Sequence, residues 1–145
     1  MTGYMIFYRN ALIAWKTKQQ ETTAMSSTEA EYMALSEVVM MMKHIKMILD
    51  FCGFPYTEPS TIFCANTGTI FLANNWVMSQ HTKHIDVRHH FIREYIEDGK
   101  YEVIFIHTNE NPADMLTKNF SSKKFNYHWM TMMDRIGHIR DLTLE

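Results

Sequence analysis

The sequence contains few residues of the kinds that cross-link or interrupt a fold: two cysteines, three prolines and five glycines in 145 residues. Cys52 and Cys64 make neither a CxxC metal pair nor a disulfide framework, so we expect buried free thiols in a reducing, intracellular compartment. No apolar run approaches the roughly 18 residues of a membrane span. The first residues also lack a signal-peptide pattern. We therefore expect no association with a membrane.

A strong net charge is also missing. The formal net charge at pH 7 is −2, which excludes a basic surface over the whole molecule, so any contact with nucleic acid must be local. A hydrophobic fraction of 46% with 21% charged residues is typical of a globular chain. One domain of this length buries roughly two-thirds of its unfolded surface. With no internal repeat or linker, we predict a single domain over 1–145, with a C-terminal helical region over 120–145.

What the sequence does contain is an alternation of strand and helix patterns. Two apolar-rich strands are predicted on either side of a tight turn at Asn10. A long helix follows, which opens at Ser26 and ends at Gly53, and Ser26 with Glu29 fits a capping box. Apolar residues that repeat at helical spacing predict its buried face: Ala30, Ala34, Val38, Met41, Ile45, Leu49 and Cys52.

The second half of the chain continues this alternation. A strand is predicted over 61–64, a short helix over 66–74 and a long helix over 82–97. Asp98-Gly99 turns the chain into the strand KYEVIFIH, and a final helical region follows NENPAD. One face of the helix over 82–97 carries Ile85, His89, Ile92 and Ile96. The final helical region runs through Phe125, Trp129 and Met133. This order, ββαβααβα, predicts one mixed α/β domain.

Two carboxylates stand near predicted helix starts, Glu31 in the long helix and Asp114 before the last helical region. Hard cations such as Mg²⁺ bind several carboxylate oxygens gathered from separate elements. Two such ions can clamp the reacting oxygens of a phosphodiester. Each residue also has a structural explanation, because Glu31 favours the helix dipole and Asp114 caps a helix. The residues taken alone favour the structural explanation.

Longer blocks carry a resemblance. AWKTKQQETTAMSSTEAEYMALSE (14–37) and TKHIDVRHHFIREYIEDGKYEVIFIHTNENPADMLTK (82–118) resemble the ribonuclease H domain at the end of copia-type LTR retrotransposon Pol polyproteins. The similarity runs from TGY at residues 2–4 to about residue 135. It implies a ribonuclease H-like mixed sheet flanked by helices. It also implies an endonuclease that hydrolyses the RNA strand of RNA–DNA hybrids during reverse transcription, with four acidic residues and two Mg²⁺ ions.

Carried over residue by residue, only two of the four acidic positions are present. Glu31 in EYMAL and Asp114 in PADMLTK match the family, as catalytic residues and as metal ligands. The family pattern CDN reads Cys64-Ala65-Asn66 here, so Ala65 replaces the expected aspartate and Asn66 offers only a neutral amide oxygen. The family's first, central strand precedes GY, whereas this sequence begins two residues before Gly3. We therefore expect an N-terminally truncated, degenerate domain that holds Mg²⁺ weakly or not at all and does not cut RNA.

The resemblance leaves two classes of function open, an inactive remnant and a non-catalytic module that binds nucleic acid or protein. Lys83, Arg88 and Arg93 are candidate phosphate contacts, and binding through them would weaken with salt and with Lys83→Ala or Arg88→Ala. The nearby histidines do not have the spacing of a zinc site: His81, His84, His89 and His90. Without the central strand two strand edges stay unpaired. The chain is then expected to misfold, to reorder its strands, or to accept a strand from a partner or from the rest of a Pol polyprotein.

Three smaller features complete the sequence interpretation. Gly68 lies inside the helix predicted over 66–74 and lowers its propensity. Together with the opening NTG, this glycine is interpreted as a further sign of decay. His107 lies near Asp114 in the sequence, where ribonucleases of this class can carry a proton-shuttling histidine. Since the metals are unsupported, His107 is interpreted as a strand-end residue.

Overall fold

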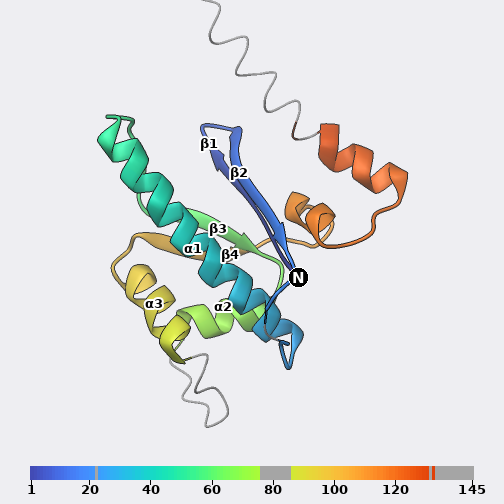
Figure 1. Cartoon of the computed structure of the whole chain (residues 1–145), viewed down its shortest axis with the longest axis horizontal. Helices are drawn as coiled ribbons and strands as arrows, with labels where there is room; N and C mark the ends of the chain where they lie inside the picture. Colours follow the sequence, from blue (N-terminus) through green and yellow to red (C-terminus); the bar gives the residue numbers. More distant parts are fainter. Residues whose placement is uncertain (22, 76–85, 131, 133–145) are drawn as a thin grey trace, which may run out of the picture. The chain divides into compact units, whose positions relative to one another are not determined.

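The computed structural model describes residues 1–21, 23–75, 86–130 and 132, and for 86–90 the backbone alone. The chain divides into two compact units (Figure 1). The terminal unit comprises Met1–Glu21 and Thr108–Glu145, and the central unit comprises Thr22–His107. Helices and strands follow one another in the predicted order, which confirms the mixed α/β class.

The terminal unit begins with an antiparallel hairpin of β1 (Thr2–Tyr8) and β2 (Ala11–Lys18). Arg9 and Asn10 join the strands, and both have positive φ, 47° and 65°. This two-residue turn has the backbone twist that suits a hairpin, and it lies where the sequence predicts it. β2 extends beyond its run of apolar residues, because the polar residues that follow also pair with β1, as far as the pair Thr2–Lys18.

The rest of the terminal unit contains the 3₁₀ helix η1 (Pro112–Leu116) and a helical stretch over 122–130. The hairpin packs closely against η1. A side chain at Gly3 would overlap that of Thr117 and press on Leu116, so only glycine permits this approach. Thr17 Oγ1 also donates a hydrogen bond of 2.7 Å to the Leu116 carbonyl. Together these contacts fix η1 on the hairpin.

The helix predicted for the last region is confirmed in its described part, 122–130. Phe125 and Trp129 are both exposed and stack on each other with ring centroids 6.3 Å apart. His128 and Met132 are buried instead. Apolar residues occur on several sides of this stretch, so spacing alone did not select the side that packs. Met133, also part of the prediction, lies outside the described residues.

The central unit opens with the long helix α1 (Ser27–Phe51). Its start is confirmed, because Ser26 Oγ accepts the Glu29 N–H at 3.1 Å. The reciprocal half of the capping box is displaced by one residue, since Glu29 Oε2 accepts from the Met25 N–H at 2.7 Å. The end is also confirmed, because Gly53 has φ of 72°, the left-handed conformation common just beyond a helix.

The predicted buried face of α1 is wrong by about one position. Its buried residues are Tyr32, Leu35, Ser36 and Val39. The predicted stripe of Ala30, Ala34, Val38, Met41, Ile45 and Leu49 is only partly buried, and Cys52 is exposed. The expectation of two buried thiols therefore holds for Cys64 alone. Since apolar side chains line most of this helix, its own sequence does not specify which stripe packs.

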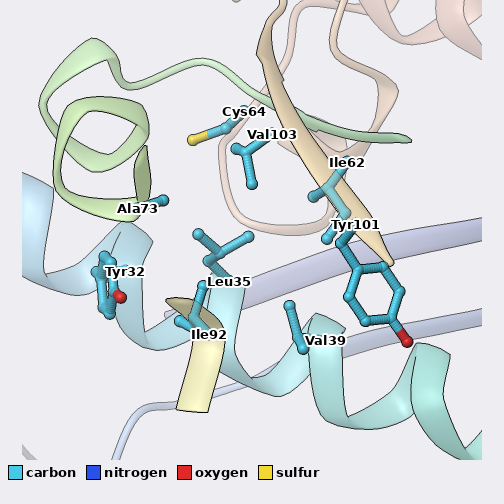
Figure 2. Close-up of a cluster of buried hydrophobic side chains, with 9 residues drawn as sticks. All are labelled: Tyr32, Leu35, Val39, Ile62, Cys64, Ala73, Ile92, Tyr101 and Val103. Atoms are coloured by element: carbon cyan, nitrogen blue, oxygen red, sulfur yellow. The ribbon is translucent and has the colours of Figure 1, made fainter. Parts of the chain in front are cut away.

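A parallel pair of strands, β3 (Ser60–Cys64) and β4 (Tyr101–Phe105), lies beside α1. The chain passes between the strands through α2 (Thr67–Asn74) and α3 (Asp86–Glu97), then turns at Gly99, where φ is 68°. Figure 2 shows the core that these elements enclose. Its nine residues are Tyr32, Leu35, Val39, Ile62, Cys64, Ala73, Ile92, Tyr101 and Val103.

For α3, the predicted face is confirmed where side chains are described: Ile92 is buried and Ile96 packs beside it. Ile85 lies outside the described residues, as does the start predicted at residue 82. The strands among the described residues form two sheets of two strands each, rather than one larger mixed sheet. The ribonuclease H-like sheet therefore stays a prediction. None of the described helices combines the length and hydropathy needed to cross a membrane.

Candidate functional site

The candidate site in the central unit is the end of β3 together with the first turns of α1. Glu31 is exposed on α1, and Cys64 is the last residue of β3. The pKa of the Cys64 thiol is raised above its ordinary value, mainly by burial. A hydrogen bond to the Asn66 backbone opposes this rise, and the negative charge of Glu31 adds to it. The assignment of Glu31 to a catalytic site stays a prediction.

Ala65 follows this strand with a methyl side chain, which offers no ligand atom to a metal ion. The adjacent Asn66 caps α2, and its Oδ1 accepts the Thr69 N–H at 3.0 Å and the Thr28 hydroxyl at 3.4 Å. Thr69 Oγ1 in turn donates to the Thr28 carbonyl at 3.1 Å. The amide oxygen beside Ala65 therefore already joins the starts of α1 and α2, and it does not replace a carboxylate.

Gly68 and the NTG opening, interpreted from the sequence as signs of decay, have structural roles in this fold. Asparagine is among the preferred residues at a helix N-cap, and Asn66 performs that role here. A Cβ added at Gly68 would lie 2.9 Å from Thr28 Oγ1, closer than real contacts allow. Gly68 thus permits the close packing of α2 on α1.

In the terminal unit, Asp114 lies within η1 and is buried. Lys118 Nζ is 2.6 Å from its Oδ2, and Asn111 Nδ2 donates to its Oδ1 at 3.3 Å. The Asp114 carbonyl also accepts the backbone N–H groups of Thr117 and Lys118. Both carboxylate oxygens are therefore engaged, and the negative charge is balanced by a lysine four residues later. Sequence reasoning missed this pairing, although the spacing of Asp114 and Lys118 could have suggested it.

The residues present do not fit a pair of Mg²⁺ ions. Glu31 belongs to the central unit and Asp114 to the terminal unit. Within the described parts of the chain, no three His, Cys, Asp or Glu side chains are gathered as a metal site requires. Hard cations held close together need several carboxylate oxygens. Among the described side chains, Glu31 is exposed on α1 and Asp114 is already paired with Lys118.

The predicted nucleic-acid contacts are only partly visible. Arg93 forms an ion pair of 3.3 Å with Glu97, and its side chain is mostly buried. Arg88 lies on α3, where the backbone alone is described, and Lys83 lies outside the described residues. Of the four clustered histidines, His89 and His90 have a described backbone, and His81 and His84 do not. His107 follows β4 and is exposed, consistent with a residue at a strand end.

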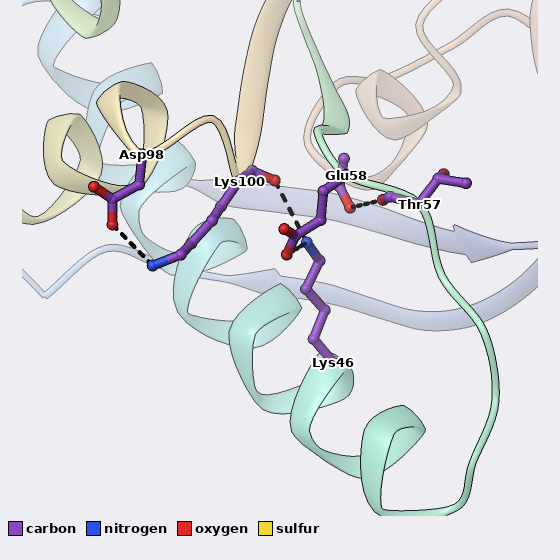
Figure 3. A network of polar contacts seen from close by, with 6 residues as sticks. Lys46, Thr57, Glu58, Asp98 and Lys100 are labelled. Atoms are coloured by element: carbon purple, nitrogen blue, oxygen red, sulfur yellow. Dashed lines mark hydrogen bonds and ion pairs between the residues drawn. The ribbon is translucent and has the colours of Figure 1, made fainter.

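Sequence reasoning also missed the polar network around Lys46 (Figure 3). Lys46 Nζ lies 3.1 Å from Glu58 Oε1 and 3.4 Å from the Lys100 carbonyl. The same ammonium group lies over the ring of Tyr101, 4.7 Å from its centroid, and burial raises the pKa of that tyrosine to about 12. The two hydrogen-bond partners of Lys46, Glu58 and Lys100, are 12 and 54 residues away in sequence, so no local pattern could have indicated them. The network fastens α1 to the start of both parallel strands.

This mixed α/β chain is similar to Pol polyproteins of plant retrotransposons. It is 42% identical over 124 residues to the retrovirus-related Pol polyprotein from transposon TNT 1-94 of Nicotiana tabacum. It is 35% and 33% identical over 123 residues to the corresponding polyproteins from transposons RE1 and RE2 of Arabidopsis thaliana. These matches cover 85 to 86% of the chain, but the chain spans only 8 to 9% of each polyprotein. No family model and no solved structure matches.

Proposed function

We propose that this chain is a ribonuclease H-related region of a retrotransposon Pol polyprotein that does not hydrolyse the RNA strand of RNA–DNA hybrids. The observation that carries the proposal is the end of β3. Ala65 offers no ligand there, and the neighbouring Asn66 oxygen is already bonded to Thr69 and Thr28. The ribonuclease H assignment itself rests on the resemblance of the sequence blocks, and the polyprotein relatives are consistent with it.

The physical reason for inactivity is electrostatic. Two divalent cations at close quarters repel each other unless several carboxylates neutralise them. Asp114 is held by Lys118 at 2.6 Å and by Asn111, so a cation would first have to displace a lysine. Glu31 is solvated on the surface of α1. Losing a supporting group beyond the direct ligands commonly costs about 10–100-fold in metal affinity or activity, and loss of a direct carboxylate ligand should cost more.

The alternative, a non-catalytic binding module, stays a weaker proposal. Its three basic residues are Lys83, Arg88 and Arg93. The described side chain among them, Arg93, pairs with Glu97 and is mostly buried. No observation on the described residues favours a phosphate-binding surface over a solvated helix face.

The test combines cleavage with metal binding. We expect the full chain to leave an end-labelled RNA–DNA hybrid intact in Mg²⁺ or Mn²⁺, under conditions in which an active ribonuclease H degrades it. In isothermal titration the wild type should bind Mg²⁺ only weakly. Ala65→Asp should raise the affinity by about tenfold or more, whereas Ala11→Asp, which adds the same charge in the hairpin, should not.

The Ala65→Asp result separates a missing ligand from a misassembled site. A gain in Mg²⁺ affinity that disappears on Glu31→Gln would place residue 65 and Glu31 at one cation site. Cleavage of the hybrid by the wild type, dependent on Mg²⁺ and lost in Glu31→Gln, would overturn the proposal.

A further inference from the structure

The C-terminal half of α1 carries an apolar face that no described part of the chain covers. Met40, Met47 and Phe51 share this face at helical spacing, Ile48 lies beside it, and Phe54 follows just beyond the end of the helix. These five side chains, the α1 patch, are between 49 and 93% exposed. All fully buried residues of α1 lie between Tyr32 and Val39. The patch therefore lies on the half of the helix that does not enter the core of the central unit.

The size of the α1 patch points to an interface. At about 150–200 Å² for each large apolar side chain, the exposed fractions amount to roughly 500 Å². Monomers rarely leave a contiguous apolar area of that size without a function. Two copies packed face to face would bury about 1,000 Å², the lower limit for a specific interface. The patch is thus sufficient for a weak self-association, with no further surface required.

Charged residues on one edge of the patch are arranged for pairing with a second copy. Lys43 and Asp50 are seven residues apart, two helical turns, and both are exposed. Within the described residues Asp50 takes part in no ion pair, and Lys43 Nζ lies over the ring of Tyr95 at 5.2 Å. Within one helix these two charges are too far apart to meet, because helical neighbours are three or four residues apart.

We propose that the α1 patch is the interface between two copies of this chain, with the two α1 helices antiparallel about a two-fold axis beside Met47. A two-fold axis perpendicular to the helix places each edge of α1 along the same edge of the second copy. Lys43 then meets Asp50 of the second copy, and the pair occurs twice, as an isologous interface requires. If the two helices were parallel, the edge with Lys43 and Asp50 would instead face the opposite edge of the second helix, which carries Ile48. The proposal concerns another surface from that of the proposed function and does not depend on it.

The first test measures self-association of the full chain by sedimentation equilibrium from about 1 to about 200 μM, the range expected for an interface of this size. The wild type should pass from monomer to dimer. Phe51→Arg should weaken association by about tenfold or more, and it should not impair folding because Phe51 is almost fully exposed. Met25→Arg is the matched control, since Met25 is also exposed but lies before α1, outside the patch. A wild type that stays monomeric throughout, or equal effects of the two arginines, would overturn the proposal.

The second test fixes the arrangement by exchanging charges. Asp50→Lys places like charges opposite each other twice and should weaken the dimer by about tenfold or more. Adding Lys43→Asp restores opposite charges in reversed order and should return the dissociation constant to within about threefold of the wild type. Failure of the double variant to recover would overturn the antiparallel arrangement, since the effect of Asp50→Lys would then arise elsewhere.

Discussion

The two units of this protein bury different chemistry. In the central unit the buried cluster is almost wholly apolar, with Leu35, Val39 and Ile92 at its centre. Among the described residues of the terminal unit, half of the buried side chains are polar: Thr2, Asp114 and His128 accompany Tyr4, Ile6 and Met132. The central unit owes its stability mainly to removal of apolar surface from water. The terminal unit depends also on hydrogen bonds and charge.

Because of this difference, the two units should respond differently to changes in pH. Apolar packing changes little with pH, whereas a buried aspartate or histidine is stable only in the charge state its surroundings favour. Asp114 has its lysine, but His128 Nε2 has no hydrogen-bond partner in the described part of the structure. The terminal unit should therefore respond to acid and to single charge changes that leave the central unit unaffected.

The largest expected effect is in the central core. Leu35→Ala removes a buried side chain from the cluster between α1 and the parallel strands, and should cost about 2–5 kcal/mol of unfolding free energy. Urea denaturation with hydrogen exchange on β3 and β4 would measure it, with Met25→Ala as the exposed control. Equal loss of protection in β1 and β2 would break the comparison, because the units would then unfold together.

A smaller effect is expected at Asp114. Asp114→Asn keeps the shape but loses the charge-assisted bond to Lys118, and should destabilise the terminal unit by about 1–2 kcal/mol, discounted because the lysine is half exposed. Glu110→Gln makes the same chemical change at a nearby exposed site and should be neutral. If hydrogen exchange shows β3 and β4 weakened by Asp114→Asn as much as β1 and β2, the assignment of this carboxylate to one unit is wrong.

The smallest effect is the acid response of His128. Burial lowers its pKa below the ordinary 6.5, the charge of Lys124 lowers it further, and Asp114 opposes both. Below pH 6.5 the unfolded chain therefore takes up a proton that the folded unit refuses, so stability falls with falling pH until the folded-state pKa is reached. One histidine contributes at most about 1.4 kcal/mol per pH unit.

Urea unfolding followed by tryptophan fluorescence between pH 8 and about pH 5 would measure this slope. His128→Gln should flatten it, and His107→Gln, at an exposed histidine, should not. An unchanged slope in His128→Gln would mean that the acid response of the terminal unit comes from another group.

Local features were predictable from the sequence because their causes are local. Ser26 caps α1, Asn10 turns the hairpin and Gly99 opens β4, each through backbone conformations that neighbouring residues dictate. The buried face of α1 was not predictable, although that of α3 was. In α1 apolar residues surround the axis, so the stripe from Tyr32 to Val39 was selected by what packed against it. The candidate site divides in the same way: Glu31, Ala65 and Asp114 were identified by motif, but the bonds that engage Asn66 and Asp114 were not.

The sequence by itself determined the order of elements and the local signals at Asn10, Ser26 and Gly99, since these depend on residue identity and short-range geometry. Only the tertiary structure decided which face of α1 is buried and that Asn66 joins two helix starts. It also decided that Lys46 fastens α1 to the parallel strands. These outcomes depend on partners tens of residues away in the chain, whose approach no local pattern encodes.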